Sequence, residues 1–135
     1  MPDISRGTVF WREAQNQAVN TSGTGHHWLV LLDPVDEDGA ERVLWVPLSS
    51  FKSWLDPSKT YVFNLGKSNK YIDARKDSCP MLKYAEVTTV DKIAAEQPKR
   101  RHEIKEEHVA GICNLLPDSR EAPKGVRDFY RKHRP

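Results

Sequence analysis

The chain has 135 residues, of which 38% are hydrophobic and 30% are charged, and this balance suits one globular domain and excludes a wholly disordered protein. Its formal net charge is only +2, so any basic surface for nucleic acid must be local. No apolar run approaches the ~20 residues that a membrane span needs, and the N-terminus lacks the apolar core of a signal peptide. We expect a single-domain cytoplasmic protein that makes no contact with a membrane.

The two cysteines, Cys79 and Cys113, are too few for a disulfide framework or a metal cluster. Reduced thiols in a cytoplasmic protein are the simplest interpretation. Cys79 could be a nucleophile or a ligand, but a lone cysteine near a turn is far more often incidental. We therefore predict no metal site and no cofactor.

Short runs of apolar, aromatic and β-branched residues, separated by turn residues, dominate the first two-thirds of the chain. No βαβ rhythm, glycine-rich phosphate loop or internal repeat interrupts them. Short strands at such close spacing indicate a small antiparallel barrel or sandwich. The predicted strands cover residues 7–11, 28–32, 43–46, 61–65, 81–84 and 86–90.

The runs 28–32 and 43–46 are predicted to form the central antiparallel ribbon. Both consist of apolar and aromatic residues, as fully buried strands do. Residues 36–39 (DEDG) between them combine short carboxylates with glycine, which favours a turn. We expect the pairing to place His27, before the first run, near Ser49, after the second.

An imidazole beside a hydroxyl at an exposed rim is the best candidate for chemistry in this sequence, with His26 as a neighbouring alternative. The other interpretation is structural: His27 would bond a backbone carbonyl, and Ser49 would cap a turn. The polar segment 14–24 leads directly into His26, and it is either a flap over this site or a mere connector.

Cationic and aromatic residues are interleaved between positions 52 and 76. Charges can follow phosphates and rings can stack bases, which is what a groove for single-stranded nucleic acid requires. A solvated strand face above a half-buried aromatic core explains the pattern equally well. The residues concerned are Lys52, Lys59, Lys67, Lys70, Arg75 and Lys76, with Trp54, Tyr61, Phe63 and Tyr71.

From residue 91 the pattern becomes helical. After a basic linker at 97–101, apolar residues recur at helical spacing from Ile104 to Leu116, and glutamates near the start match the helix dipole. A second helix, with a basic face, is expected to start at Pro123, since proline suits the first helical position. We therefore predict one domain, 1–135, with a barrel at about 7–93 and a helical tail at about 102–133.

Three short segments carry a resemblance to a known family. They are Arg6-Gly7-Thr8-Val9-Phe10-Trp11, Gly25-His26-His27-Trp28 and Val46-Pro47-Leu48-Ser49. They resemble the opening strand, the G-x-R-P segment and the V-P-x-T segment of the MazF/PemK toxins of the Kid/CcdB superfamily. Residues 82–93 occupy the place of a later strand, and the tail 121–130 looks like that of PemK-like reading frames of mobile elements, which carry a His-His-Trp variant.

The resemblance implies a small antiparallel SH3-like barrel with a C-terminal helix. It also implies a metal-independent endoribonuclease that cleaves single-stranded RNA and leaves 2′,3′-cyclic phosphate and 5′-OH ends. The position of the family arginine holds His27 here, and a histidine can exchange a proton at neutral pH because its ordinary pKa is near 6.5. We expect His27 to take the 2′-OH proton, His26 to replace or orient it, and Ser49 to hydrogen-bond the phosphate.

RNA contacts are expected from four residues: Lys52, Lys83, Arg75 and Trp54. Lys52 and Lys83 are also the candidates for a leaving-group acid and for a cation at the developing charge. The resemblance further implies a homodimer, whose interface forms the RNA groove, and a cognate antitoxin. The alternative is a non-catalytic SH3-like module that binds RNA or a protein partner, because a site that has lost the family arginine also fits a decayed enzyme. A regulatory or structural protein of a mobile element is a third possibility.

Overall fold

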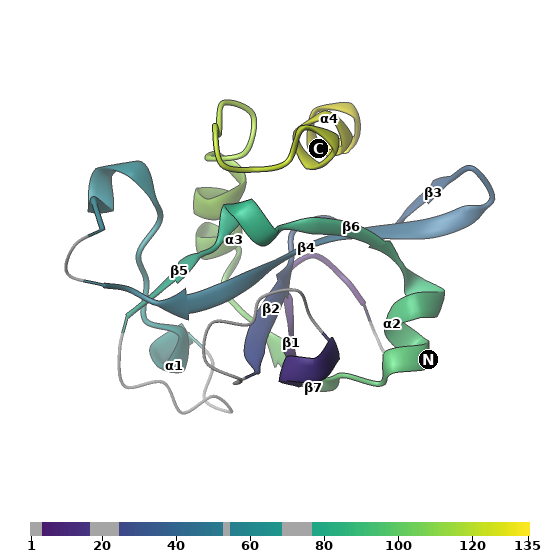
Figure 1. Cartoon of the computed structure of the whole chain (residues 1–135), viewed down its shortest axis with the longest axis horizontal. Coiled ribbons are helices and arrows are strands. Elements are labelled where there is room, and N and C mark those ends of the chain that lie inside the picture. The colour runs from purple at the N-terminus through teal and green to yellow at the C-terminus, as the bar shows by residue number, and fades with distance from the viewer. Residues whose placement is uncertain (1–3, 17–24, 53–54, 69–76) are drawn as a thin grey trace.

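The computed structural model describes residues 4–16, 25–52, 55–68 and 77–135, and its body is one antiparallel sheet curled into a half-barrel (Figure 1). The strands follow the order β3-β4-β2-β1-β7, and β5 and β6 also pair with β4. This confirms the prediction of a small, mainly β fold. The strands are β1 (Thr8–Arg12), β2 (His26–Val30), β3 (Val35–Glu37), β4 (Ala40–Ser50), β5 (Ser78–Pro80), β6 (Glu86–Thr89) and β7 (Lys99–Glu103).

Four α-helices accompany the sheet in the described ranges, and two of them follow the last strand, as predicted. They are α1 (Leu65–Ser68), α2 (Val90–Glu96), α3 (Glu106–Cys113) and α4 (Lys124–His133). Single 3₁₀ turns occupy η1 (Ala14–Asn16), η2 (Pro57–Lys59) and η3 (Leu82–Tyr84). Across the described ranges, none of the helices combines the length and the apolar character that crossing a membrane would require.

The long strand β4 is the axis of the sheet. It pairs with β3 and β2 along one edge and with β6 and β5 along the other. The predicted acidic turn tightens to Asp38 and Gly39, whose φ angles of 54° and 80° suit the two-residue turns that match strand twist. The central ribbon is therefore confirmed, and β4 is longer than the predicted run 43–46.

Three predicted elements differ in the structure. The run 61–65 contributes only an isolated bridge between Phe63 and Ser78, and η3 replaces the strand expected at 81–84. The basic segment at 97–101, interpreted as a linker, instead enters β7, which pairs with β1. The sheet thus extends beyond the predicted barrel end near 93, because an edge strand made of charged residues has the composition of a solvated linker.

Alternation along the strands divides the core into two clusters. Leu44 and Val46 of β4 face the larger cluster, to which α3 and α4 contribute Ile112 and Phe129. Trp45 faces the smaller cluster on the other side, which α2 closes. Figure 1 shows α4 lying over one face of the sheet and α2 at the end of β6.

Arg12 is a buried cation at the centre of the smaller cluster. Its side chain lies against two indoles, with Cζ 4.5 Å from the ring centroid of Trp28 and 4.4 Å from that of Trp45. Its Nη2 lies 2.7 Å from Oε1 of Glu96, and its Nη1 lies 3.3 Å from Oε1 of Glu86. The same Glu86 oxygen accepts a 2.8 Å hydrogen bond from Trp45 Nε1. One guanidinium therefore connects four strands and α2.

The helix α3 packs closely on the segment before α1. Tyr61 Oη and His108 Nδ1 are 2.8 Å apart, and the ring of His108 stacks on Phe63 with centroids 4.9 Å apart. Gly111 makes this approach possible, because a Cβ at this position would collide with three atoms of the Tyr61 ring. The rings that predicted a strand at 61–65 are thus used for packing against a helix.

We expect Arg12→Met to destabilise the fold by about 3 kcal/mol, since removing one partner of a buried ion pair leaves the other charge uncompensated. The free energy of unfolding in urea measures the change. The double variant Arg12→Met/Glu96→Gln should lose less than the sum of the two single variants. Arg120→Met, at an exposed position, is the control. A loss for Arg12→Met no larger than that of the control would contradict the assignment.

Two glycine-to-alanine changes should have opposite signs. Gly111→Ala should destabilise by about 1–3 kcal/mol, because the Tyr61 ring must move and overpacking outweighs the gain in helix propensity. Gly125→Ala in α4 should stabilise by up to about 1 kcal/mol, because its Cβ would meet no heavy atom within 4 Å. Thermal and urea unfolding of both variants measure the two changes in stability. A stabilised Gly111→Ala would show that the Tyr61 ring can move aside at little cost.

Candidate functional site

The predicted pair of His27 and Ser49 lies where the start of β2 and the end of β4 are side by side. Both residues belong to the strands and are half-buried, rather than standing outside them on an exposed rim. The register pairs His27 with Leu48. Because successive side chains of a strand point to opposite faces, His27 and Ser49 face opposite sides of the sheet, and His26 shares the face of Ser49. The structure thus brings His26, rather than His27, onto the face of the serine.

His27 lies beside Trp11 of the neighbouring strand. The two residues are paired in the β1–β2 ladder, and their rings meet edge to face with centroids 4.9 Å apart. Burial, helped by the positive charges of Arg101 and His26, lowers the pKa of His27 to about 4. The imidazole is therefore neutral at neutral pH, and it is a weaker base than the ordinary histidine on which the predicted mechanism was built.

His26 ends the same ladder opposite Arg12. It is half-buried, and burial lowers its pKa from the ordinary value, so that it too favours the neutral form. Arg12 shares this face but is not available to a phosphate, since its guanidinium is held by Glu96 and Glu86. Sequence patterning did not single out Arg12, because a lone arginine in a β-rich run carries no signal of its ring and carboxylate partners.

Ser49 lies at the wall of a pocket of about 310 Å³. Its Oγ is 3.9 Å from Sγ of Cys79, the residue opposite it in the β4–β5 ladder. Burial raises the pKa of the Cys79 thiol, against the hydrogen bond from Ser49 and the charge of Lys52, which lower it. The thiol is therefore protonated at neutral pH. The pocket is lined by Ser49, Leu55, Asp56, Lys59, Thr60, Cys79, Pro80, Met81, Leu82, Lys83, Tyr84 and Glu121.

Two predicted site residues, Ser49 and Lys83, therefore share one pocket. The ammonium of Lys83 lies 5.7 Å from the ring centroid of Tyr84, so a cation and an aromatic face stand together there. Lys59 adds a second exposed cation to the lining. Lys52 is exposed, and its charge acts on Cys79. The remaining RNA-binding predictions, Trp54 and Arg75, lie outside the described residues.

In the described part of the chain, no group of three or more His, Cys, Asp or Glu side chains is arranged to hold a metal ion. A scan of the chain against protein-family models and a search of curated proteins found no match. The resemblance to the MazF/PemK toxins therefore rests on the short sequence segments quoted above.

The lowered pKa of His27 makes a prediction about stability. Between about pH 6.5 and pH 4 the unfolded chain binds a proton that the folded chain does not, so stability should fall as the pH is lowered through this window. His27→Gln should remove up to about 3 kcal/mol of that fall. Urea unfolding of parent and variant at a series of pH values measures it, and parallel curves would contradict the burial of a neutral imidazole.

Proposed function

We propose that the chain is a metal-independent endoribonuclease of toxin–antitoxin type, specific for single-stranded RNA and giving 2′,3′-cyclic phosphate and 5′-OH ends. The observation that carries the proposal is the shared face of His26 and Ser49 at the end of the β2–β4 ribbon, with Ser49 lining a pocket that also holds Lys59 and Lys83. A proton acceptor, a hydroxyl donor and cations are what cleavage by the neighbouring 2′-OH requires.

In this proposal His26 takes over the role first assigned to His27. A neutral imidazole on the face of Ser49 accepts the 2′-OH proton while the 2′-oxygen attacks phosphorus. The bond from phosphorus to the 5′-oxygen breaks, and Lys83 or water returns a proton to that oxygen. Ser49 donates a hydrogen bond to a non-bridging phosphate oxygen, where negative charge grows in the transition state. His27, packed on Trp11, positions the strand that carries His26.

The lining of the pocket beside Ser49 suits a single-stranded rather than a double-stranded RNA substrate. Lys59 and Lys83 can follow the phosphates, and the ring of Tyr84 offers a surface for one unpaired base. A base can stack in this way only when it is not paired within a duplex. A homodimer that lengthens this surface and a cognate antitoxin that covers it complete the proposal.

The second candidate is a binding module of the same fold without catalysis. One observation favours it: the position of the family arginine holds a histidine whose pKa is lowered to about 4, and the nearby Arg12 is committed to two carboxylates. Such a surface keeps its exposed lysines and can still grip RNA, because phosphate contacts supply most of the affinity.

Incubation of the purified chain with mixed-sequence single-stranded RNA in EDTA, with mapping of the product ends, tests the proposal. His26→Ala should lower the cleavage rate on the order of 10²–10⁴-fold and Ser49→Ala on the order of 10²-fold. RNA affinity, measured by fluorescence anisotropy, should hardly change in either variant.

His27→Ala, assayed beside them, decides between the two histidines: a larger loss there than in His26→Ala would return the role of base to His27. His27→Arg restores the residue of the resembled family and tests whether a cation serves better than an imidazole at this position. If the parent binds RNA but leaves it intact, the binding module is the function. If it neither binds nor cleaves RNA, both candidates fail.

A further inference from the structure

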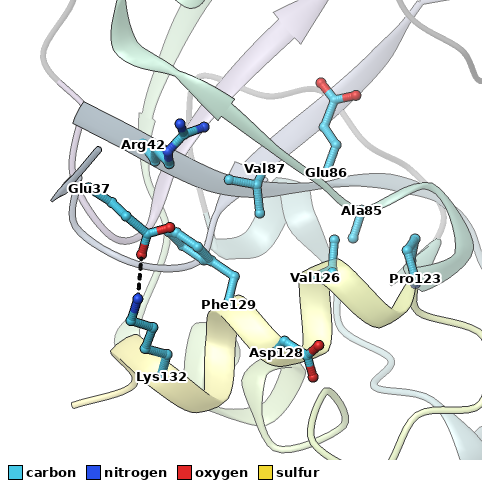
Figure 2. A pocket seen from close by; sticks show the side chains of 11 residues that line it. Glu37, Arg42, Ala85, Glu86, Val87, Pro123, Val126, Asp128, Phe129 and Lys132 are labelled. Atoms are coloured by element: carbon cyan, nitrogen blue, oxygen red, sulfur yellow. Dashed lines mark ion pairs between the residues drawn. The ribbon is translucent and has the colours of Figure 1, made fainter. Parts of the chain in front are cut away.

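A second pocket lies away from the histidines, between α4 and the strands β4 and β6 (Figure 2). Its volume is about 540 Å³, within the range of small-molecule sites. Figure 2 shows Val87 on the strand side and Val126 and Phe129 on the helix side, facing the space between them. Ala85 and Pro123 extend this apolar lining.

The carboxylates of the lining are already paired. Glu37 Oε2 lies 3.3 Å from Nζ of Lys132 and 2.5 Å from Nε2 of His133. Figure 2 shows Glu86 pointing away from α4, and its Oε1 lies 3.3 Å from Nη1 of Arg12. Asp128 is paired with Lys124 at 2.8 Å. These groups therefore present no free negative charge that would attract a cationic ligand.

Arg42 is different from the other charged groups of this pocket. Its Nε is buried and has no hydrogen-bond partner, and among the described residues its guanidinium makes no ion pair. The backbone of Arg42 is fixed by pairing with Val35 on one side and Thr89 on the other. The guanidinium of Arg42 is thus half-buried, held in place by its strand and without an anion among the described residues, and its N–H groups are donors that an incoming acceptor can bond.

We infer that this pocket binds a small organic monoanion, a carboxylate attached to an apolar body of the size of a medium-chain fatty acid. The carboxylate pairs with the guanidinium of Arg42, and the apolar body covers Val87, Val126 and Phe129. One unpaired positive charge matches one negative charge. The other charged groups of the lining are already paired with one another or with neighbouring residues, so they offer no second positive charge for a dianion. The inference is independent of RNA cleavage.

The test uses the full ¹⁵N-labelled chain and octanoate, with octan-1-ol as the uncharged probe of the same length. Octanoate should shift the amide signals of residues 85–87 and 123–132 in a saturable way and bind at least tenfold more tightly than octan-1-ol. Arg42→Gln should weaken octanoate at least tenfold and leave octan-1-ol within twofold of the parent. Arg120→Gln, an exposed arginine outside the lining, should change neither affinity.

Equal affinities of the parent for octanoate and octan-1-ol would overturn the inference, as would shifts confined to another surface or full octanoate affinity in Arg42→Gln. The comparison of the two probes on the parent decides the question even if Arg42→Gln does not fold. A peptide with one carboxylate between apolar residues is run in parallel. If it binds at the same signals more tightly than octanoate, the occupant is a protein segment and not a small molecule.

Discussion

Arg12 lies over the neighbouring rings of Trp28 and Trp45, and it reaches Glu96 at the end of α2 and Glu86 in β6. A cation in an apolar cluster is unfavourable unless rings and carboxylates surround it. The helix α2 therefore has to close this side of the sheet, and β6 has to align so that Glu86 serves both Arg12 and Trp45. Trp45 contacts both Arg12 and Glu86 only in one register of β4 against β2 and β6. This network therefore fixes the central register of the sheet.

The same network determines which charged groups are available to the candidate site. His26 stands opposite Arg12 in the β1–β2 ladder, and Ser49 lies on the same face at the end of β4. The guanidinium of Arg12 is held by two carboxylates, so under the proposed function a phosphate on this face would depend on the lysines beyond β4 for positive charge. Under the proposed function, the RNA would therefore follow the pocket of Lys59 and Lys83 rather than cross β1.

Much of the fold follows from local patterns. The apolar runs of the central ribbon, the Asp38–Gly39 turn and the spacing of apolar residues in α3 and α4 each point to a single element. The sequence pattern gave a wrong prediction where tertiary packing determined the secondary structure. Tyr61 and Phe63 have strand propensity, but their rings pack on His108, and β7 is an edge strand whose composition is that of a linker.

The candidate site was only partly accessible from the sequence. Patterning located His26, His27 and Ser49 at the ends of two paired strands, but it did not supply the register, and a shift of one residue exchanges the faces of a strand. The lowered pKa of His27 depends on its burial against Trp11, which no local spacing reveals. Arg42 could not have been identified from the sequence. It stands out only because the carboxylates around it are paired with other residues, which the structure alone shows.

The pairing of β1 with β7 has a consequence for how the chain reaches its native state. Arg6 meets Glu106 across 100 positions of sequence, and Arg12 meets Glu96 across 84. Contacts between residues so distant in the sequence must be formed after large loops have closed, which places such a topology among slow folders. During synthesis the first strand has no lasting partner on its outer edge until residues near 103 have left the ribosome. Folding of the sheet is therefore a late event, and until then the apolar strands β1, β2 and β4 depend on being shielded from other chains.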